Sequence, residues 1–180
     1  MFPKAHAAAY VMMAFRIAYF KVYYPLAYYC AYFSIRASAF NYELMCMGRE
    51  RLEFYISDYK KRSNELSKKE QDTLKDMRIV QEMYARGFEF MPINLYTAKA
   101  HLFQIIDGKL MPSFSTIDGL GDKAAEAIVE GVKQGKFLSR DDFKQRCKVS
   151  GTVVDVMADL GILEDMPISN QMSILDFMNA

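Results

Sequence analysis

The chain has 180 residues, of which 52% are hydrophobic, and that fraction excludes an intrinsically disordered polypeptide. Its 23 lysines and arginines nearly balance its 22 acidic residues, but four of the basic residues and none of the acidic ones fall in the first 40 positions. An isolated basic region in a near-neutral chain favours a local anionic ligand over a broad nucleic-acid surface. The alternative is that these side chains only extend their charges out of an apolar helix.

Residues 5–24 show a helical pattern that ends at Tyr24-Pro25, and a second helix is predicted over residues 25–34. A helix that crosses a membrane needs about 20 consecutive apolar residues. Arg16 interrupts this run at a cost of at least about 2.5 kcal/mol, so no membrane span is expected. The first helix has apolar side chains on all sides, and we therefore expect residues 1–40 to be buried inside something larger.

Residues 41–66 are predicted to form a short helix and a polar connection. The next helix is better marked, because Ser67 and Glu70 have the spacing of a capping box and Gly87 is typical of a helix end. Its apolar residues recur at helical spacing, which predicts an ordinary amphipathic helix without chemistry.

The pattern changes after Gly87. Apolar residues 101–106 precede Asp107-Gly108, which predicts one short β-hairpin. Three more helices are predicted, at residues 122–134, 139–148 and 150–159. The chain is therefore predicted to be mainly α-helical with a small β-hairpin.

Gly119-Leu120-Gly121 leads directly into one of these helices. Glycines let the backbone turn tightly and approach a ligand closely, and the start of a helix offers unpaired amides that can hold a DNA phosphate. Lys123 favours an anion at this hairpin, whereas Asp122 disfavours one. The alternative interpretation is a glycine-capped turn that binds nothing.

No catalytic or metal-binding group is recognisable from spacing alone. The sequence has no nucleotide-binding loop, no catalytic triad, no metal-binding helix motif and no pair of aspartates in an apolar strand. The three cysteines are too far apart for a zinc site or a disulfide framework, which is typical of reduced thiols in a cytoplasmic protein. We therefore assign no catalytic residue and no metal ligand.

A polar tail follows Pro167 and contains the apolar group QMSILDF. Ile, Leu and Phe seldom gather in an exposed tail, so this group favours a peptide that docks in a pocket on a partner protein. The alternative is a terminal turn that packs on its own domain.

The stretch FPKAHAAAYVMMAFRIAYFKVYYP resembles the bacterial C-family replicative DNA polymerases, specifically the PolC-type DNA polymerase III alpha subunit. The resemblance continues through MYARGF, LYTAKAHLF, SFSTIDGLGDKAAEAIV, FLSRDDFKQRCKVSGTVVDVMADLGIL and NQMSIL. It covers nearly the whole chain in order and is weakest over residues 41–70.

The resemblance implies the C-terminal end of such a polymerase, whose exonuclease, phosphoesterase-like and palm regions would precede Met1. Residues 1–87 would end the helical fingers, residues 88–165 would form a duplex-binding helix-hairpin-helix domain, and residues 166–180 would be a flexible tail. The implied function is template-directed addition of deoxynucleotides to a primer 3′ end. Mg²⁺ is expected in the missing palm and no cofactor in this chain. Without the palm aspartates the chain would be inactive alone.

The implied partners are primer-template DNA, deoxynucleoside triphosphates, the sliding clamp and the remainder of the polymerase. Lys4 and His6 would lie near the nucleotide triphosphate, with Arg16 and Lys21 as supporting charges, although Lys4, His6 and Arg16 do not share one helix face. The other implied contacts are DNA-binding residues Gly119, Leu120, Gly121 and Lys123, and clamp-binding residues Gln171, Met172, Ile174, Leu175 and Phe177. Leu175 replaces the aromatic residue of the clamp pattern, and Phe177 would supply the ring. The rival interpretation is a free-standing, non-enzymatic helix-hairpin-helix DNA-binding or clamp-adaptor protein.

Overall fold

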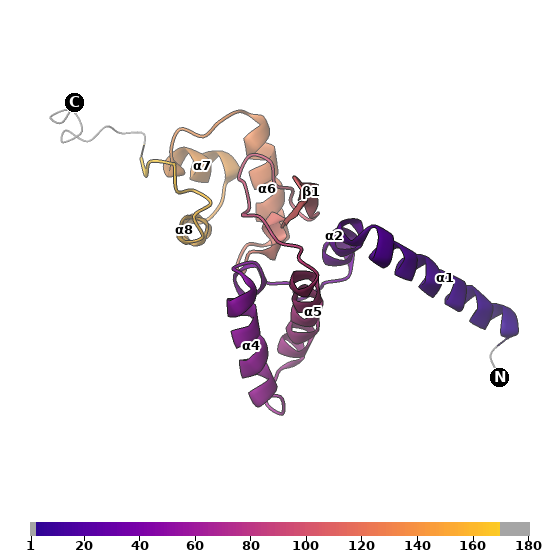
Figure 1. The fold of residues 1–180 in the computed structure, drawn as a ribbon. Helices are drawn as coiled ribbons and strands as arrows, with labels where there is room; N and C mark the ends of the chain where they lie inside the picture. The colour runs from indigo at the N-terminus through magenta and orange to yellow at the C-terminus, as the bar shows by residue number, and fades with distance from the viewer. Residues whose placement is uncertain (1–2, 170–180) are drawn as a thin grey trace. The chain divides into compact units, whose positions relative to one another are not determined.

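The computed structural model describes residues 3–169, most of them in helices (Figure 1). These residues fall into two units, which we call unit 1 and unit 2. Unit 1 runs to Met91 and also takes in Leu102–Met111, whereas unit 2 consists of Pro92–His101 and the chain from Pro112 onward. Within residues 3–169, no helix has the length and apolar character needed to cross a bilayer.

Unit 1 contains helices and one small antiparallel sheet, which confirms the predicted fold class. Its helices are α1 (Lys4–Tyr23), α2 (Pro25–Ile35), α3 (Tyr42–Met45), α4 (Arg49–Lys61) and α5 (Lys68–Ala85), and its strands are β1 (Gln104–Ile106) and β2 (Lys109–Met111). The strands pair in the register Gln104 with Met111 and Ile106 with Lys109. Asp107 (φ 49°) and Gly108 (φ 75°) make the predicted two-residue turn, because each adopts the positive φ that such a turn needs.

Local signals fix the boundaries of two helices as predicted. Pro25 is the first residue of α2, where its missing amide costs nothing. The Ser67 amide donates to the Glu70 carboxylate at 2.8 Å, and the Ser67 hydroxyl accepts from the Glu70 amide at 3.3 Å, which closes the capping box of α5.

Helix α4 is longer than the short helix predicted within residues 41–66. It has 13 residues, most of them polar, and only two of them are buried, Leu52 and Ile56. These two lie one helical turn apart and enter the core of unit 1, so packing extends the helix where the sequence pattern is weak.

The core of unit 1 is built around aromatic and methionine side chains. Phe33 lies 5.6 Å, centroid to centroid, from each of Phe90 and Phe103, and Phe40 lies 5.2 Å from Phe33. The other buried members of this core are Tyr29, Met45, Leu52, Ile56, Met77, Val80, Met83 and Leu110.

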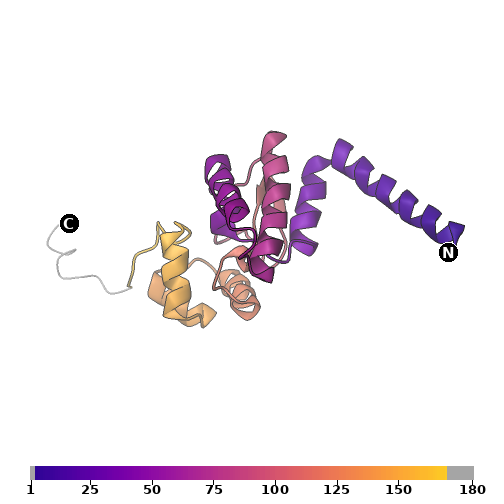
Figure 2. The ribbon, with the colours of Figure 1, turned by 90° about the horizontal axis from the view of Figure 1, so that it is seen from below.

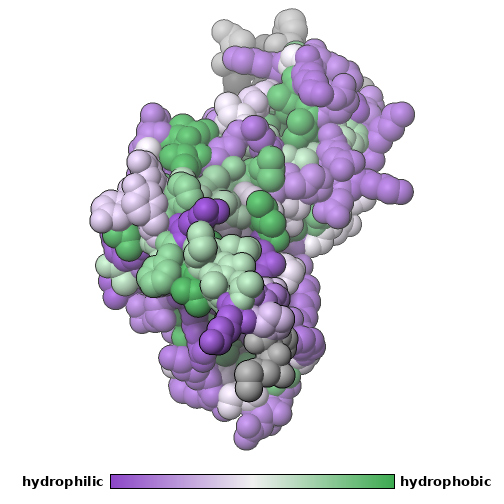
Figure 3. All heavy atoms as spheres, turned by 90° about the vertical axis from the view of Figure 1, so that its right-hand side faces the viewer, coloured by the Kyte–Doolittle hydropathy of each residue, from purple (hydrophilic) through white to green (hydrophobic). Residues whose placement is uncertain are grey.

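Helix α1 contributes no buried residue to unit 1. Its exposed large apolar residues are Tyr10, Val11, Met12, Met13, Phe15, Ile17, Tyr19, Phe20, Val22 and Tyr23. Figure 3 looks toward this helix and shows hydrophobic residues gathered with scattered charged ones. A groove of about 600 Å³ where α1 meets α2 is lined mainly by apolar side chains, among them Phe20, Tyr28 and Tyr32.

Unit 2 consists of a 3₁₀ turn and three helices. They are η1 (Phe114–Thr116), α6 (Asp122–Lys133), α7 (Arg140–Cys147) and α8 (Gly151–Asp159), close to the predicted positions. Helix α7 packs against α6 and α8 (Figure 2). The buried residues of this unit include Phe114, Ile128, Phe143, Met157 and Leu163.

Two features hold α6 close to α7. A Cβ atom at Gly131 would lie 2.6 Å from Cys147 Sγ, so glycine is what allows this approach. The Arg146 guanidinium donates to the carbonyls of Gly131, Gly135 and Lys136, at 2.9 Å in each case, and lies 4.3 Å from the centre of the Phe137 ring. This arginine therefore satisfies carbonyls that the end of α6 leaves open.

Candidate nucleic-acid interface

The first hairpin of unit 2 connects η1 to α6. Gly119 has φ +79°, a conformation that glycine adopts without strain. Leu120 follows and is buried, and its amide donates to the Ile117 carbonyl at 3.2 Å. Gly121 then takes the N-cap position of α6, with φ −72° and ψ 160°. The hairpin thus consists of one residue in the left-handed conformation, one buried apolar residue and one helix N-cap in an extended conformation.

Neither the backbone angles nor the packing at position 121 requires a glycine. Its φ is one that any residue adopts, and a Cβ atom built there would have no atom within 4 Å. The backbone of Gly121 therefore faces open space at the start of a helix. No side chain caps α6, and the first amides of a helix lack partners within the helix, so they are donors available to an anion.

The charges at this helix start are mixed. Asp122 and Lys123 are the first two residues of α6, and each is exposed. A carboxylate here competes with an external anion for the helix amides, whereas the ammonium attracts one.

A second hairpin, between α7 and α8, repeats the same conformations. Lys148 is left-handed (φ 51°, ψ 37°), Val149 is buried, and Ser150 is the N-cap of α8 with φ −72° and ψ 159°. The cap angles match those of Gly121 within one degree. Lys144 Nζ lies 3.6 Å from the position of a Cβ atom at Gly151, which puts a cation beside the start of α8.

Sequence reasoning missed this second hairpin, although it predicted the helices on either side. The first hairpin has two glycines as a signal, and the second has lysine and serine at the same places. The signal shared by the two hairpins is an apolar residue followed directly by a helix cap, Leu120-Gly121 and Val149-Ser150.

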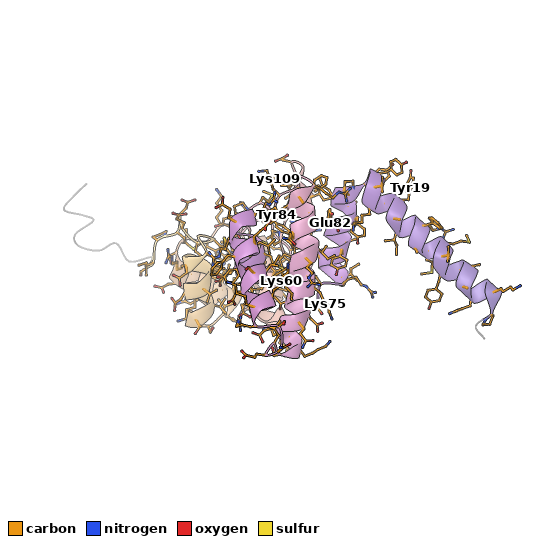
Figure 4. All side chains as sticks on the ribbon, turned by 60° about the horizontal axis from the view of Figure 1, so that its bottom comes forward. Tyr19, Lys60, Lys75, Glu82, Tyr84 and Lys109 are labelled. Atoms are coloured by element: carbon orange, nitrogen blue, oxygen red, sulfur yellow. The ribbon has the colours of Figure 1, made fainter. Side chains whose placement is uncertain are left out.

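The predicted nucleotide-contacting residues lie on α1 but do not share one environment. Lys4, His6 and Arg16 are exposed, whereas Lys21 is partly buried and its ammonium donates to Glu82 at 2.8 Å. Glu82 lies on the side of α5 that faces α2 (Figure 4) and also accepts from the Tyr29 hydroxyl at 3.0 Å.

The Lys21–Glu82 pair changes the titration of each partner. The hydrogen bond to Glu82 raises the pKa of Lys21. Burial acts to raise the pKa of Glu82, but the hydrogen bonds from Lys21 and Tyr29 outweigh burial and lower it. Since Arg86 also donates to the Lys21 carbonyl at 2.9 Å, Lys21 helps to fasten the end of α1 to α5.

Two further site predictions concern clamp binding and metal binding. The proposed clamp-binding residues Gln171, Met172, Ile174, Leu175 and Phe177 lie outside the described residues. Within residues 3–169, no three histidine, cysteine or acidic side chains come together in a way that could hold a metal ion.

Residues 87–172 match the helix-hairpin-helix motif family. The two hairpins and their helices therefore place this part of the chain in the helix-hairpin-helix class. Over nearly its whole length the chain is also similar to named proteins. It is 44% identical over 174 residues to DNA polymerase III PolC-type from Caldanaerobacter subterraneus, and 48% identical over 178 residues to that from Streptococcus suis. The corresponding protein from Streptococcus pneumoniae is 46% identical over 178 residues.

These alignments cover 97–98% of the chain but 12% of each relative. The chain is thus similar over nearly its whole length to one part of PolC-type DNA polymerase III, and it spans about one eighth of the length of these relatives.

Proposed function

We propose that this chain acts as the C-terminal portion of a DNA-directed DNA polymerase and that unit 2 grips double-stranded DNA by its phosphate backbone. The match to PolC-type DNA polymerase III over 97% of the chain supports the polymerase assignment. The observation that carries the DNA grip is the exposed, side-chain-free start of α6 at Gly121.

The two hairpins supply the physical mechanism. Each presents the start of a helix next to a basic side chain, Lys123 at the first and Lys144 at the second. Backbone amides that contact phosphate oxygens fix the position of a protein on DNA but read no bases. Such contacts suit a polymerase, because it must hold a duplex of any sequence.

The chain is proposed to support the polymerase reaction without performing its chemistry. Nucleotide addition would need Mg²⁺ held by carboxylates in the rest of the polymerase. We propose no residue of this chain as a ligand of that ion. Lys4 and His6, with Arg16, would border the incoming deoxynucleotide, where charge-assisted hydrogen bonds to phosphate are strong. Residues 1–87 would thus end the fingers, residues 88–165 would bind duplex, and residues 166–180 would tether the sliding clamp.

The exposed apolar surface of α1 supports a place within a longer polymerase. A helix with apolar residues on all sides is stable in water only when other parts of a protein cover it. A free-standing DNA-binding or clamp-adaptor protein would leave this helix and the groove beside it uncovered. The polymerase assignment therefore accounts for unit 1 as well as for unit 2.

A binding experiment tests the DNA grip. Gly121→Leu keeps an allowed φ and places a side chain in the open space, so the hairpin should fold while phosphate loses its access. Losing one charge-assisted hydrogen bond of about 1.5 kcal/mol would weaken duplex binding about tenfold, measured by fluorescence anisotropy at fixed salt.

The matched control is Gln134→Leu, an exposed position at the other end of α6. It adds the same side chain and should leave the affinity unchanged. Equal affinity of Gly121→Leu and the unmodified chain at matched salt would overturn the proposed grip.

A further inference from the structure

Two carboxylates of α6 face the imidazole ring of His101 in unit 2. The Nε2 atom lies 3.2 Å from Glu126 Oε1, and the Nδ1 atom lies 3.6 Å from Asp122 Oδ1. Asp122 is the first residue of α6, the helix whose start we propose to hold phosphate.

The backbone fixes His101 in this place. The Phe114 amide donates to the Lys99 carbonyl at 3.0 Å, and the Ser115 amide donates to the Ala100 carbonyl at 2.9 Å. Residues 99–101 therefore run beside η1, which leads into the first hairpin, and Phe114 is fully buried. The ring is thus held next to α6 by the same turn that positions Gly121.

Each nitrogen of the His101 ring has its own carboxylate neighbour. A neutral imidazole carries a hydrogen on only one nitrogen, so its other nitrogen would present a lone pair to a carboxylate. An imidazolium can direct an N–H toward each of Glu126 and Asp122. Protonation therefore places one positive charge between the two carboxylates, beside the start of α6.

The added charge matters because the helix start is acidic. Residues 118–126 hold three acidic side chains, Asp118, Asp122 and Glu126, against the single cation Lys123. Like charge repels phosphate and acts against the helix amides. Neutralising one of these carboxylates would lower that repulsion.

We propose that His101 is a positioning residue of the DNA-binding hairpin, whose imidazolium offsets Asp122 and Glu126 and so strengthens the hold of unit 2 on a DNA phosphate. The proposal rests on the DNA grip proposed above. It predicts that duplex affinity depends on pH through this one side chain, with the tighter binding on the acidic side.

Among the described residues of unit 2, two carboxylates are paired with the ring. Asp122 and Glu126 face it from α6, and Lys99 lies two residues earlier on its own segment. The stretch 113–117, which is bonded to that segment, contains only serine, threonine and apolar side chains. The pair of carboxylates thus dominates the local field.

The experiment compares duplex binding by the 180-residue chain at about pH 6 and at about pH 8, the range in which histidine changes charge. A short labelled duplex is followed by fluorescence anisotropy at constant ionic strength. The unmodified chain should bind about three- to tenfold more tightly at the lower pH, because one charge near phosphate changes. His101→Gln should bind equally at the two pH values.

A rescue and a control sharpen the comparison. His101→Lys keeps a permanent charge and should bind at about pH 8 as tightly as the unmodified chain does at about pH 6. Gln134→Leu, the exposed control at the other end of α6, should keep the full pH effect. Asp76 in unit 1 also changes charge in this pH range. Because every variant contains Asp76, it cannot account for a difference between them.

The outcomes separate the two proposals. DNA binding that keeps its pH effect in His101→Gln overturns the role of His101 and leaves the DNA grip standing. A uniform loss of affinity at both pH values, without rescue by lysine, also overturns it. Failure of the unmodified chain to bind duplex at either pH overturns the DNA grip itself.

Discussion

The carboxylate of Asp76 accepts a hydrogen bond from the backbone amide of Ala39 at 3.2 Å. One turn earlier on α5, the Thr73 hydroxyl donates to the carbonyl of the same Ala39, also at 3.2 Å. These two buried side chains thus satisfy the backbone of the loop between α2 and α3. Burial raises the pKa of Asp76 to about 6 in spite of the hydrogen bond that it accepts.

The raised pKa of Asp76 predicts a stability that falls as the pH rises. The pKa of an aspartate in an unfolded chain is about 3.9. Between about pH 4 and about pH 6, the folded chain therefore keeps a proton that the unfolded chain releases. The contribution of Asp76 to the free energy of unfolding then decreases through this window. Asp76→Asn should stabilise the chain by about 1 to 2 kcal/mol at about pH 8 and change little at about pH 4.

Urea denaturation at the two pH values measures this effect. The control is Asp72→Asn, one turn earlier on the exposed side of α5, where the hydrogen bond from Lys75 lowers the pKa of the carboxylate. This variant should not stabilise the chain at about pH 8. A destabilised Asp76→Asn at that pH would contradict the predicted sign.

Gly131 should be intolerant of a side chain. Gly131→Ala would place its Cβ 2.6 Å from Cys147 Sγ and force α6 away from α7, at a cost of about 1 to 3 kcal/mol. Cys147→Ala removes the opposing sulfur, so the double variant should lose less stability than the two single changes added together. A double-mutant cycle from urea denaturation measures this coupling, and simple additivity would show that the contact is relieved elsewhere.

Lys4 and Lys21 should differ in a full-length PolC-type polymerase. Lys4 is exposed, and Lys4→Ala should raise the deoxynucleotide KM or lower kcat, because a charge near the triphosphate is lost. Lys21 is paired with Glu82, and Lys21→Ala should chiefly lower stability. Steady-state kinetics and thermal unfolding separate the two effects. Unchanged kinetics in Lys4→Ala would remove it from the nucleotide site.

Hydrogen exchange should be uneven along the isolated chain. We expect fast exchange in α1, because it buries no residue, and slow exchange in residues 113–162, where α7 packs against α6 and α8. Mass spectrometry of the chain, and of the full-length polymerase, measures both regions. Equal protection of α1 in the two proteins would argue against its being covered by the rest of the polymerase.

The elements that could be predicted from sequence are those set by local chemistry. Pro25, the Ser67 capping box and the Asp107-Gly108 turn act through their own backbone or within a few residues, so their positions were readable in advance. Gly119 likewise predicts the first hairpin.

The features that could not be predicted depend on distant parts of the chain. Helix α4 is held by burial of Leu52 and Ile56 against other helices, which no local pattern records. Lys21 and Glu82 are 61 residues apart in the sequence but form an ion pair. Because of this contact, Lys21 is not a freely exposed cation. At the second hairpin, Lys148 takes a left-handed conformation without the glycine that usually signals one.

The chain passes between its two units three times, leaving unit 1 after Met91, returning for Leu102–Met111 and leaving again at Pro112. No single cut therefore separates the two units, because each fragment that holds one unit whole also holds a segment of the other. A fragment that begins at residue 88 would take the β-hairpin, with Phe103 and Leu110, away from the core that they complete. This interleaved connectivity means that gene fusion or recombination at one point cannot transfer unit 2 without also taking a segment that completes the core of unit 1.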